Sequence, residues 1–163
     1  MEEKSSHISG GITIQELTNE QKIANLKKAT DVLLTLPESF SLLNGWNRRD
    51  LLLHLWTWDV EYIRLCEAKI KNKLKKFQFN YEELGMAYSN WNDYIMEKFE
   101  DLSEEDIKEQ FITDRTKLLK LLEKLKDLPE NDVPKEYMQT NQILDLWQHD
   151  KMHLNGAGFA VFY

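Results

Sequence analysis

The sequence predicts an all-α protein, a bundle of four main helices with one extra helix before the third. Apolar residues recur at spacings of three and four along most of the chain, as they do on one face of a helix. Only six Gly and three Pro interrupt the 163 residues, so the helices should be long. No segment alternates apolar and polar residues as a half-buried strand or a hairpin would. Amphipathic helices with few breaks bury their apolar faces most simply as a bundle.

The first two helices have recognisable boundaries. Thr18 and Gln21 form a capping-box pair and Pro37 ends the segment, so the first helix should run from about Asn19 to Leu36. The second should run from about Asn47 to Lys71. Their apolar stripes are Ile23, Leu26, Leu33 and Leu34 in the first helix and Leu51, Leu55, Trp58, Tyr62 and Leu65 in the second.

Two further start signals follow the second helix. Asn80 with Glu83 predicts a helix that continues to about Asp101. Ser103 with Asp106 predicts a helix that continues to about Lys126. The sequence leaves open whether these segments form two helices or one bent helix.

The last helix follows a loop. Residues 127–139 contain two prolines and predict an irregular connection. Thr140 or Asn141 can then cap a final helix that runs towards Phe159, weakened near its end by Gly156 and Gly158.

Length and composition predict one domain, residues 18–163, after a flexible N-terminal tail of residues 1–17. The net charge of −7 argues against a nucleic-acid binder, which would present a basic face. No apolar run reaches the length of a membrane helix, and the first residues lack the pattern of a signal peptide. A single cysteine, Cys66, fits a reducing compartment. We therefore expect a cytoplasmic protein that binds neither membrane nor nucleic acid.

Three histidines are the candidate site. His149 and His153 are four residues apart, which places both imidazoles on one face of the last helix. His54 lies on the apolar side of the second helix, so all three side chains should face a common core. Taken alone, His54 is more simply a hydrogen-bonded histidine at a packing surface, and the other two are ordinary helix residues. Together they match a metal site built from facing helices of a bundle.

Such a site would suit Zn²⁺, Ni²⁺ or Fe²⁺ with an open coordination position. The ion would acidify a bound water or activate a thiolate. Each imidazole needs a partner on its outer nitrogen. Asp50 and Asp145 each precede a histidine by four residues and are the second-shell candidates, although both also fit a helix surface.

Aromatic residues near the histidines predict a pocket. Trp58, Tyr88, Trp91 and Trp147 would form its walls, with plain core packing as the alternative, and Asp59 could lie at its mouth. Cys66 has no histidine at helical spacing to activate it and is expected to be a buried structural thiol.

Two motifs carry a resemblance to a known family. The segment Trp46-Asn47-Arg48-Arg49-Asp50-Leu51-Leu52-Leu53-His54-Leu55 resembles the second helix of the DinB/YfiT-like superfamily of metalloenzymes, in which a Trp is followed by Asp-Leu-x-x-His-Leu. The segment His149-Asp150-Lys151-Met152-His153 resembles the His-x-x-x-His signature of its last helix. The resemblance implies an up-down-down-up four-helix bundle. It also implies a divalent metal held by His54, His149 and His153.

The ClbS/DfsB-like branch is the most similar part of that superfamily. Trp58-Asp59, Asn90-Trp91-Asn92 and the segment 102–105 resemble it. Some members open a reactive ring in a genotoxin without requiring the full triad of histidines. This chain has all three, but Leu154-Asn155-Gly156 stands where His-Arg-Gly-Gln is usual.

The resemblance implies a metal-dependent enzyme for thiol S-transfer or hydrolysis of a small electrophile, in detoxification or the stress response. Its partners would be a small-molecule substrate and a low-molecular-weight thiol, and a homodimer is common among such proteins. Two alternatives stay open: a ClbS/DfsB-like protective hydrolase that needs no metal, and a non-catalytic stress or binding protein. Activity that survives chelation would favour the first alternative, and an ion whose coordination is filled by protein groups would favour the second.

Overall fold

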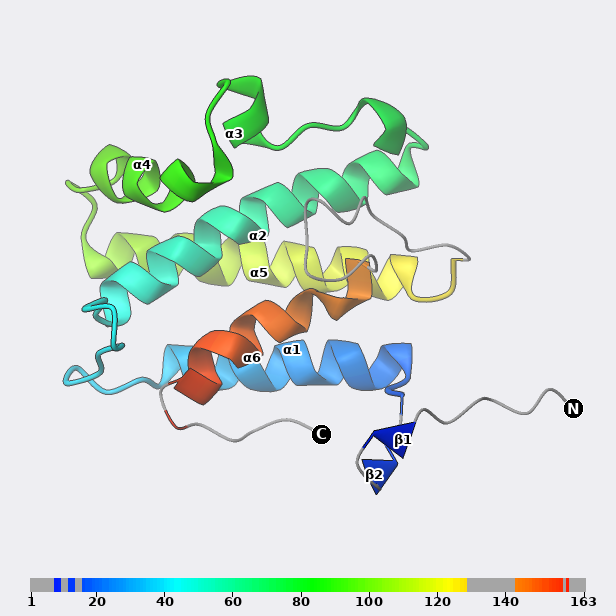
Figure 1. The fold of residues 1–163 in the computed structure, drawn as a ribbon, viewed down its shortest axis with the longest axis horizontal. Helices are drawn as coiled ribbons and strands as arrows, with labels where there is room; N and C mark the ends of the chain where they lie inside the picture. The colour runs from blue at the N-terminus through cyan, green and yellow to red at the C-terminus, as the bar shows by residue number, and fades with distance from the viewer. Residues whose placement is uncertain (1–7, 10–11, 14–15, 129–142, 157, 159–163) are drawn as a thin grey trace, which may run out of the picture.

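The computed structural model describes residues 8–9, 12–13, 16–128, 143–156 and 158, and within them the fold is helical (Figure 1). The prediction of an all-α fold is confirmed for this part of the chain, apart from two short strands near its start. The α-helices are α1 (Asn19–Leu34), α2 (Arg48–Ile70), α3 (Asn80–Glu83), α4 (Trp91–Lys98), α5 (Glu104–Leu125) and α6 (Trp147–Gly156). Short 3₁₀ turns are η1 (Leu74–Lys76), η2 (Tyr88–Asn90) and η4 (Ile143–Leu146).

A two-residue hairpin precedes the helices, so the expectation that the chain has none was wrong. Strand β1 (Ile8–Ser9) pairs antiparallel with β2 (Ile12–Thr13). The other residues of the predicted tail up to residue 15, His7 included, lie outside the described residues.

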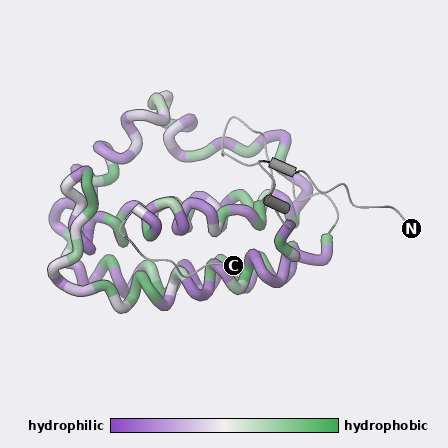
Figure 2. The backbone as a smooth tube through the Cα atoms, turned by 60° about the horizontal axis from the view of Figure 1, so that its bottom comes forward, coloured by the Kyte–Doolittle hydropathy of each residue, from purple (hydrophilic) through white to green (hydrophobic). Residues whose placement is uncertain are grey.

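Helix α2 is the central element. It packs along α5, contacts α4 on another side, and faces α6 through the histidines described below (Figure 1). Helix α1 contacts both α5 and α6. Because neighbours cover α2 on several sides, Leu51, Leu52, Leu53 and Leu55 are all buried. In Figure 2, apolar and polar colours alternate along the helices, as expected for helices with one face in a core.

Capping pairs fix where α1 and α2 begin, and the pair at the start of α1 was predicted. The backbone N–H of Gln21 donates to Thr18 Oγ1 (3.2 Å), and the backbone N–H of Thr18 donates to Gln21 Oε1 (2.9 Å). Asn47 and Asp50 form the same reciprocal pair at the start of α2 (3.0 and 3.3 Å). Such pairs satisfy N–H groups that have no partner within the helix.

The region between α2 and α5 differs from the prediction. The prediction of a single helix from Asn80 to Asp101 is wrong. The chain turns at Gly85, whose φ is +66°, and the next α-helix begins only at Trp91. Leu84 and Tyr88, on either side of this turn, are 57% and 62% exposed.

Helices α4 and α5 are separate elements, which settles the alternative between two helices and one bent helix. Helix α4 ends at Lys98, and Ser103 then caps α5 by accepting from the backbone N–H of Asp106 (3.1 Å). At the other end of the chain, α6 follows the turn η4. The predicted caps Thr140 and Asn141, most of the predicted loop of residues 127–139, and Phe159 lie outside the described residues.

Among the described residues, none of the helices combines the length and the apolar character needed to cross a bilayer.

The turn at Gly85 gives the first testable prediction. Gly85→Ala should lower the free energy of unfolding by about 1–2 kcal/mol, because an L-residue is strained in the left-handed region. The matched control is Gly156→Ala at the end of α6, where φ is not positive and the added Cβ meets nothing within 4 Å. Urea denaturation of both variants measures the difference. Equal stability of the two variants would contradict this account of the break between α3 and α4.

Candidate metal centre

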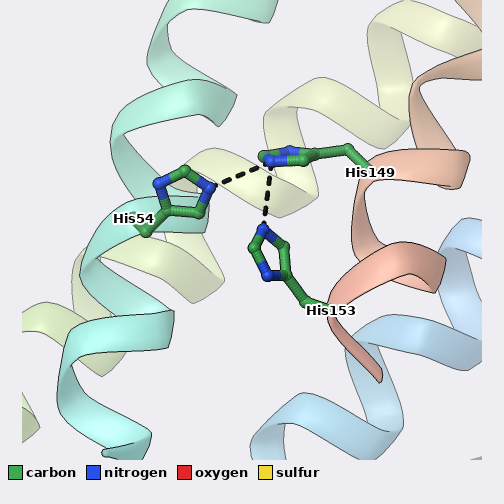
Figure 3. A group of neighbouring side chains, drawn as sticks. All are labelled: His54, His149 and His153. Atoms are coloured by element: carbon green, nitrogen blue, oxygen red, sulfur yellow. Dashed lines mark hydrogen bonds between the residues drawn. The ribbon is translucent and has the colours of Figure 1, made fainter. Parts of the chain in front are cut away.

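The structure brings the three predicted histidines together. His54 projects from α2, and His149 and His153 project towards it from successive turns of α6 (Figure 3). The Nε2 atom of His149 is 2.9 Å from Nε2 of His54 and 3.3 Å from Nε2 of His153. One ring nitrogen from each histidine lies within 4.8 Å of those of the other two. Three nitrogen ligands therefore converge on one point between the helices.

Hydrogen bonding within the cluster cannot satisfy all three nitrogens. A nitrogen of a neutral imidazole offers either one N–H or one lone pair. Nε2 of His149 faces two other nitrogens, so it can complete a hydrogen bond with only one of them. A cation that accepts a lone pair from each ring would satisfy the whole set.

The spacings also fit a metal ion. With metal–nitrogen bonds of about 2.05 Å, neighbouring ligands are about 3.3 Å apart in a tetrahedral site and about 2.9 Å apart in an octahedral one. The two observed Nε2 separations, 3.3 and 2.9 Å, lie within the range of such ligand spacings. The donor set thus suits a borderline divalent ion such as Zn²⁺ or Ni²⁺.

Asn92 determines the tautomer of His54. Nδ1 of His54 lies 2.9 Å from Oδ1 of Asn92 on α4, and because that oxygen only accepts, Nδ1 carries the proton. Nε2 then presents its lone pair to the cluster, which is the form that binds a metal. Sequence reasoning missed Asn92, since only the packing of α4 against α2 brings it to His54.

The aspartates predicted to support the histidines have other contacts. Asp50 caps α2 and lies 3.4 Å from Nη1 of Arg49, while the two ring nitrogens of His54 contact Asn92 and His149. Asn92 therefore takes the place that was expected for Asp50. Asp145 forms an ion pair with Lys22 (2.6 Å), and its role behind His149 stays a prediction.

The environment keeps the imidazoles neutral. Burial, and then the proximity of His149 and His153, lowers the pKa of His54 well below its ordinary value. Burial, with His153 and Arg115 adding to it, lowers the pKa of His149 to about 3. Burial also lowers the pKa of His153, although Asp150 acts in the opposite direction. Neutral imidazoles have the lone pairs that metal binding requires.

A cavity of about 280 Å³ adjoins the cluster. Besides the three histidines, the side chains that line it are aromatic, amide, acidic or aliphatic: Trp46, Trp58, Tyr62, Tyr88, Asn44, Asn92, Gln148, Asp145, Leu146 and Met152. Trp58 and Tyr88 thus lie where a pocket was predicted. Trp46 was not among the predicted pocket residues, yet its ring is centred 4.9 Å from that of His54 and 6.2 Å from that of His153.

Three residues predicted for the pocket lie outside its lining. Trp91 is buried behind Trp58, with ring centres 6.4 Å apart, because α4 turns it into the core. Trp147 is buried beneath the ammonium group of Lys151. Asp59 points away from His54 and binds Arg115.

Cys66 is buried, and burial raises the pKa of its thiol to about 12. The proton therefore stays on the sulfur near neutral pH, which agrees with the expectation of a structural thiol.

Below the histidines, the guanidinium of Arg115 is buried among groups from three other helices. Its Nε and Nη2 donate to the two carboxylate oxygens of Asp59 (2.7 and 3.0 Å). Its Nη1 and Nη2 donate to Asp150 (2.6 and 3.3 Å), and Nη1 also donates to Oγ1 of Thr30 (3.1 Å). We call Arg115, Asp59, Asp150 and Thr30 the arginine cluster. It links α5 to α2, α6 and α1.

The groups of the arginine cluster shift one another's pKa values. Burial lowers the pKa of Arg115, but the two carboxylates outweigh it, so the pKa lies above its ordinary value. Burial raises the pKa of Asp59 to about 7, although Arg115 acts in the opposite direction. Sequence reasoning had no signal for this pairing, since Asp59 and Arg115 are 56 positions apart.

Arg115→Met should lower the free energy of unfolding by about 3–5 kcal/mol, because it leaves two buried carboxylates without a partner. The control is Lys117→Met on the same helix, which removes an exposed ion pair with Glu67 and should cost less than about 1 kcal/mol. Chemical denaturation followed by circular dichroism measures both. A similar small loss for both variants would contradict the linking role of the arginine cluster.

Fold and site together define an all-helical protein with three convergent histidines beside a small cavity. Comparisons with protein-family models, with curated proteins and with solved structures find no match for this chain. Its function must therefore be inferred from the residues themselves.

Proposed function

We propose that this protein binds one divalent metal ion through His54, His149 and His153 and uses it as an enzyme on a small electrophile. The observation that carries the proposal is the convergence of three neutral imidazoles whose nitrogens cannot all be satisfied by one another. If the histidines had only a structural role, each Nε2 atom in the cluster would be expected to have its own hydrogen-bond partner.

We propose further that the chain is a DinB-like up-down-down-up bundle. Chain directions in Figure 1 support this, because α1 and α6 run one way while α2 and α5 run the other. Helix α2 carries the single histidine and α6 carries the pair, as the two sequence motifs led us to expect. The short helices α3 and α4 would be an addition before the third bundle helix.

An open coordination position favours an enzyme over a structural metal site. Within the described residues, the ligand group contains three histidines and no fourth His, Cys, Asp or Glu. Structural zinc sites usually have four protein ligands, whereas catalytic sites have three and an open position. All three histidines line the cavity, so a small molecule in it would lie beside the proposed ion. A bound ion would act as a Lewis acid and lower the pKa of a water or thiol.

The surrounding residues have defined roles in this proposal. Asn92 holds the proton on the outer nitrogen of His54, which orients the ring. The rings of Trp46 and Trp58 pack against His54 and His149 respectively, and so help to hold the two imidazoles in place. Thiol S-transfer or hydrolysis is the reaction class we propose, with a low-molecular-weight thiol as a co-substrate of the first.

Metal titration tests the proposal. Protein stripped with chelator should take up one Zn²⁺ or Ni²⁺ per chain, measured by plasma mass spectrometry after dialysis. His54→Ala and His153→Ala should each weaken affinity at least about 100-fold, because each removes a direct ligand, whereas loss of an outer partner costs about 10–100-fold. Asn92→Ala should weaken metal affinity about 10–100-fold, because it removes the outer partner of His54.

The control is His7→Ala, which removes the chain's remaining histidine and leaves the three proposed ligands unchanged. Equal stoichiometry in His54→Ala and wild type would refute a shared site. So would loss of the ion in His7→Ala. Circular dichroism spectra of all variants should coincide, since the substitutions leave the helical core in place.

A further inference from the structure

We propose that two copies of this chain associate about a two-fold axis, through the edge of the molecule that runs from the end of α2 through α3 to the end of α4. Opposite charges stand at the two ends of this edge, and exposed apolar side chains lie between them. The association needs no bound metal and is independent of the proposed function.

One end of the edge carries only positive charge. Residues 69–76, which we call the basic turn, contain five lysines and no acidic residue, in a chain whose net charge is −7. None of the five forms an ion pair within the described residues. Four of them are exposed: Lys71, Lys73, Lys75 and Lys76. The backbone N–H of Lys73 donates to the carbonyl of Ala68 (2.7 Å), which holds the turn against the last turn of α2.

The other end of the edge has an excess of negative charge. Residues 97–105, which we call the acidic segment, contain five acidic residues and one lysine. Four of the acidic side chains are exposed and have no ion pair in the described part of the chain: Glu97, Glu100, Asp101 and Glu105. Arg49, in the first turn of α2, donates to the carbonyls of Phe99 and Leu102 (2.7 and 2.8 Å). These bonds fix the acidic segment at the start of α2, whereas the basic turn lies at its end.

Exposed apolar side chains lie between the two charged ends. Ile70, Leu84 and Tyr88 are 44%, 57% and 62% exposed. In Figure 1 the segment that follows α2 runs back along the top of the view, from the basic turn through α3 to α4, and then leads into the acidic segment. Covered by a second copy, these side chains would supply the apolar centre that protein interfaces usually have.

A two-fold axis near α3 brings all these features together. The two copies of α2 then run antiparallel, so the basic turn of each copy lies opposite the acidic segment of the other. Both contacts form at once, because a two-fold axis makes the second a copy of the first. A parallel arrangement would instead place like charges opposite one another, which is unfavourable.

The length of the edge suits such an interface. Helix α2 has 23 residues and is therefore about 35 Å long. A standard interface buries roughly 800 Å² per partner, the area of a disc about 32 Å across. The charged ends of the edge would thus lie at the rim of the interface, where charged residues are usual.

Exchange of the charges tests this interface. At about 100 µM the wild-type chain should sediment as a reversible dimer. Two triple variants reverse the charge at one end each. The first carries Lys73→Glu, Lys75→Glu and Lys76→Glu, and the second carries Glu97→Lys, Glu100→Lys and Asp101→Lys. Each variant alone should dimerise at least about tenfold more weakly, because like charges then face one another.

An equimolar mixture of the two triple variants should form a dimer again. The first variant has an excess of acidic residues at both ends of the edge and the second has an excess of lysines at both ends, so opposite charges meet in the mixed pair. The dissociation constant of the mixed pair should lie within about threefold of the wild-type value. Circular dichroism spectra of all these proteins should coincide, which excludes unfolding as the cause of weaker dimerisation.

The control changes the net charge as much as the first triple variant but leaves this edge unchanged. It carries Lys27→Glu and Lys28→Glu on α1 and Lys120→Glu on α5, and it should dimerise within about threefold of wild type. A wild-type chain that stays monomeric would overturn the proposal and leave the basic turn to a different acidic partner. Polymers that grow with concentration, equal weakening in the control, or a mixture that stays monomeric would also overturn it.

Discussion

Much of the structure depends on one buried guanidinium. Arg115 is 1% exposed and binds carboxylates from α2 and α6 and a hydroxyl from α1. A charged group so far from water is tolerated only when its N–H groups have hydrogen-bond acceptors. The four helices must therefore keep the positions that supply those acceptors. The requirement is directional, unlike the apolar packing around it. The hydrogen bonds of Arg115 specify the rotation of α6 relative to α2. Apolar contacts alone would define that rotation less well.

The hydrogen bonds of Arg115 also position the helices that carry the three histidines. Asp150 lies between His149 and His153 in sequence, and when it binds Arg115 it fixes the turn of α6 from which both rings project. Asp59, five residues beyond His54, also binds Arg115 and so fixes the orientation of α2. On α2, His54 faces the cavity while Asp59 faces the arginine cluster. In the proposed metal site, the ligands would thus be placed before an ion binds, which would lower the cost of binding.

Sequence reasoning succeeded where the cause is local. Thr18, Asn47 and Ser103 mark helix starts because capping involves residues three positions apart. The spacing of His149 and His153 fixed their common face for the same reason. Sequence reasoning failed where the interacting residues come from distant segments of the chain. Asn92 and Arg115 became visible only after α4 and α5 were placed against α2, and no pattern along the chain indicates those rotations. The break at Gly85 was missed because apolar spacing continued past it.

Anomalous scattering from a zinc-soaked crystal tests the central claim most directly. The account predicts a single strong peak, with Nε2 of His54, His149 and His153 each about 2.0–2.1 Å away and at least one further position facing the cavity. A peak held by other residues, a fourth protein ligand closing the site, or no peak at all would contradict it.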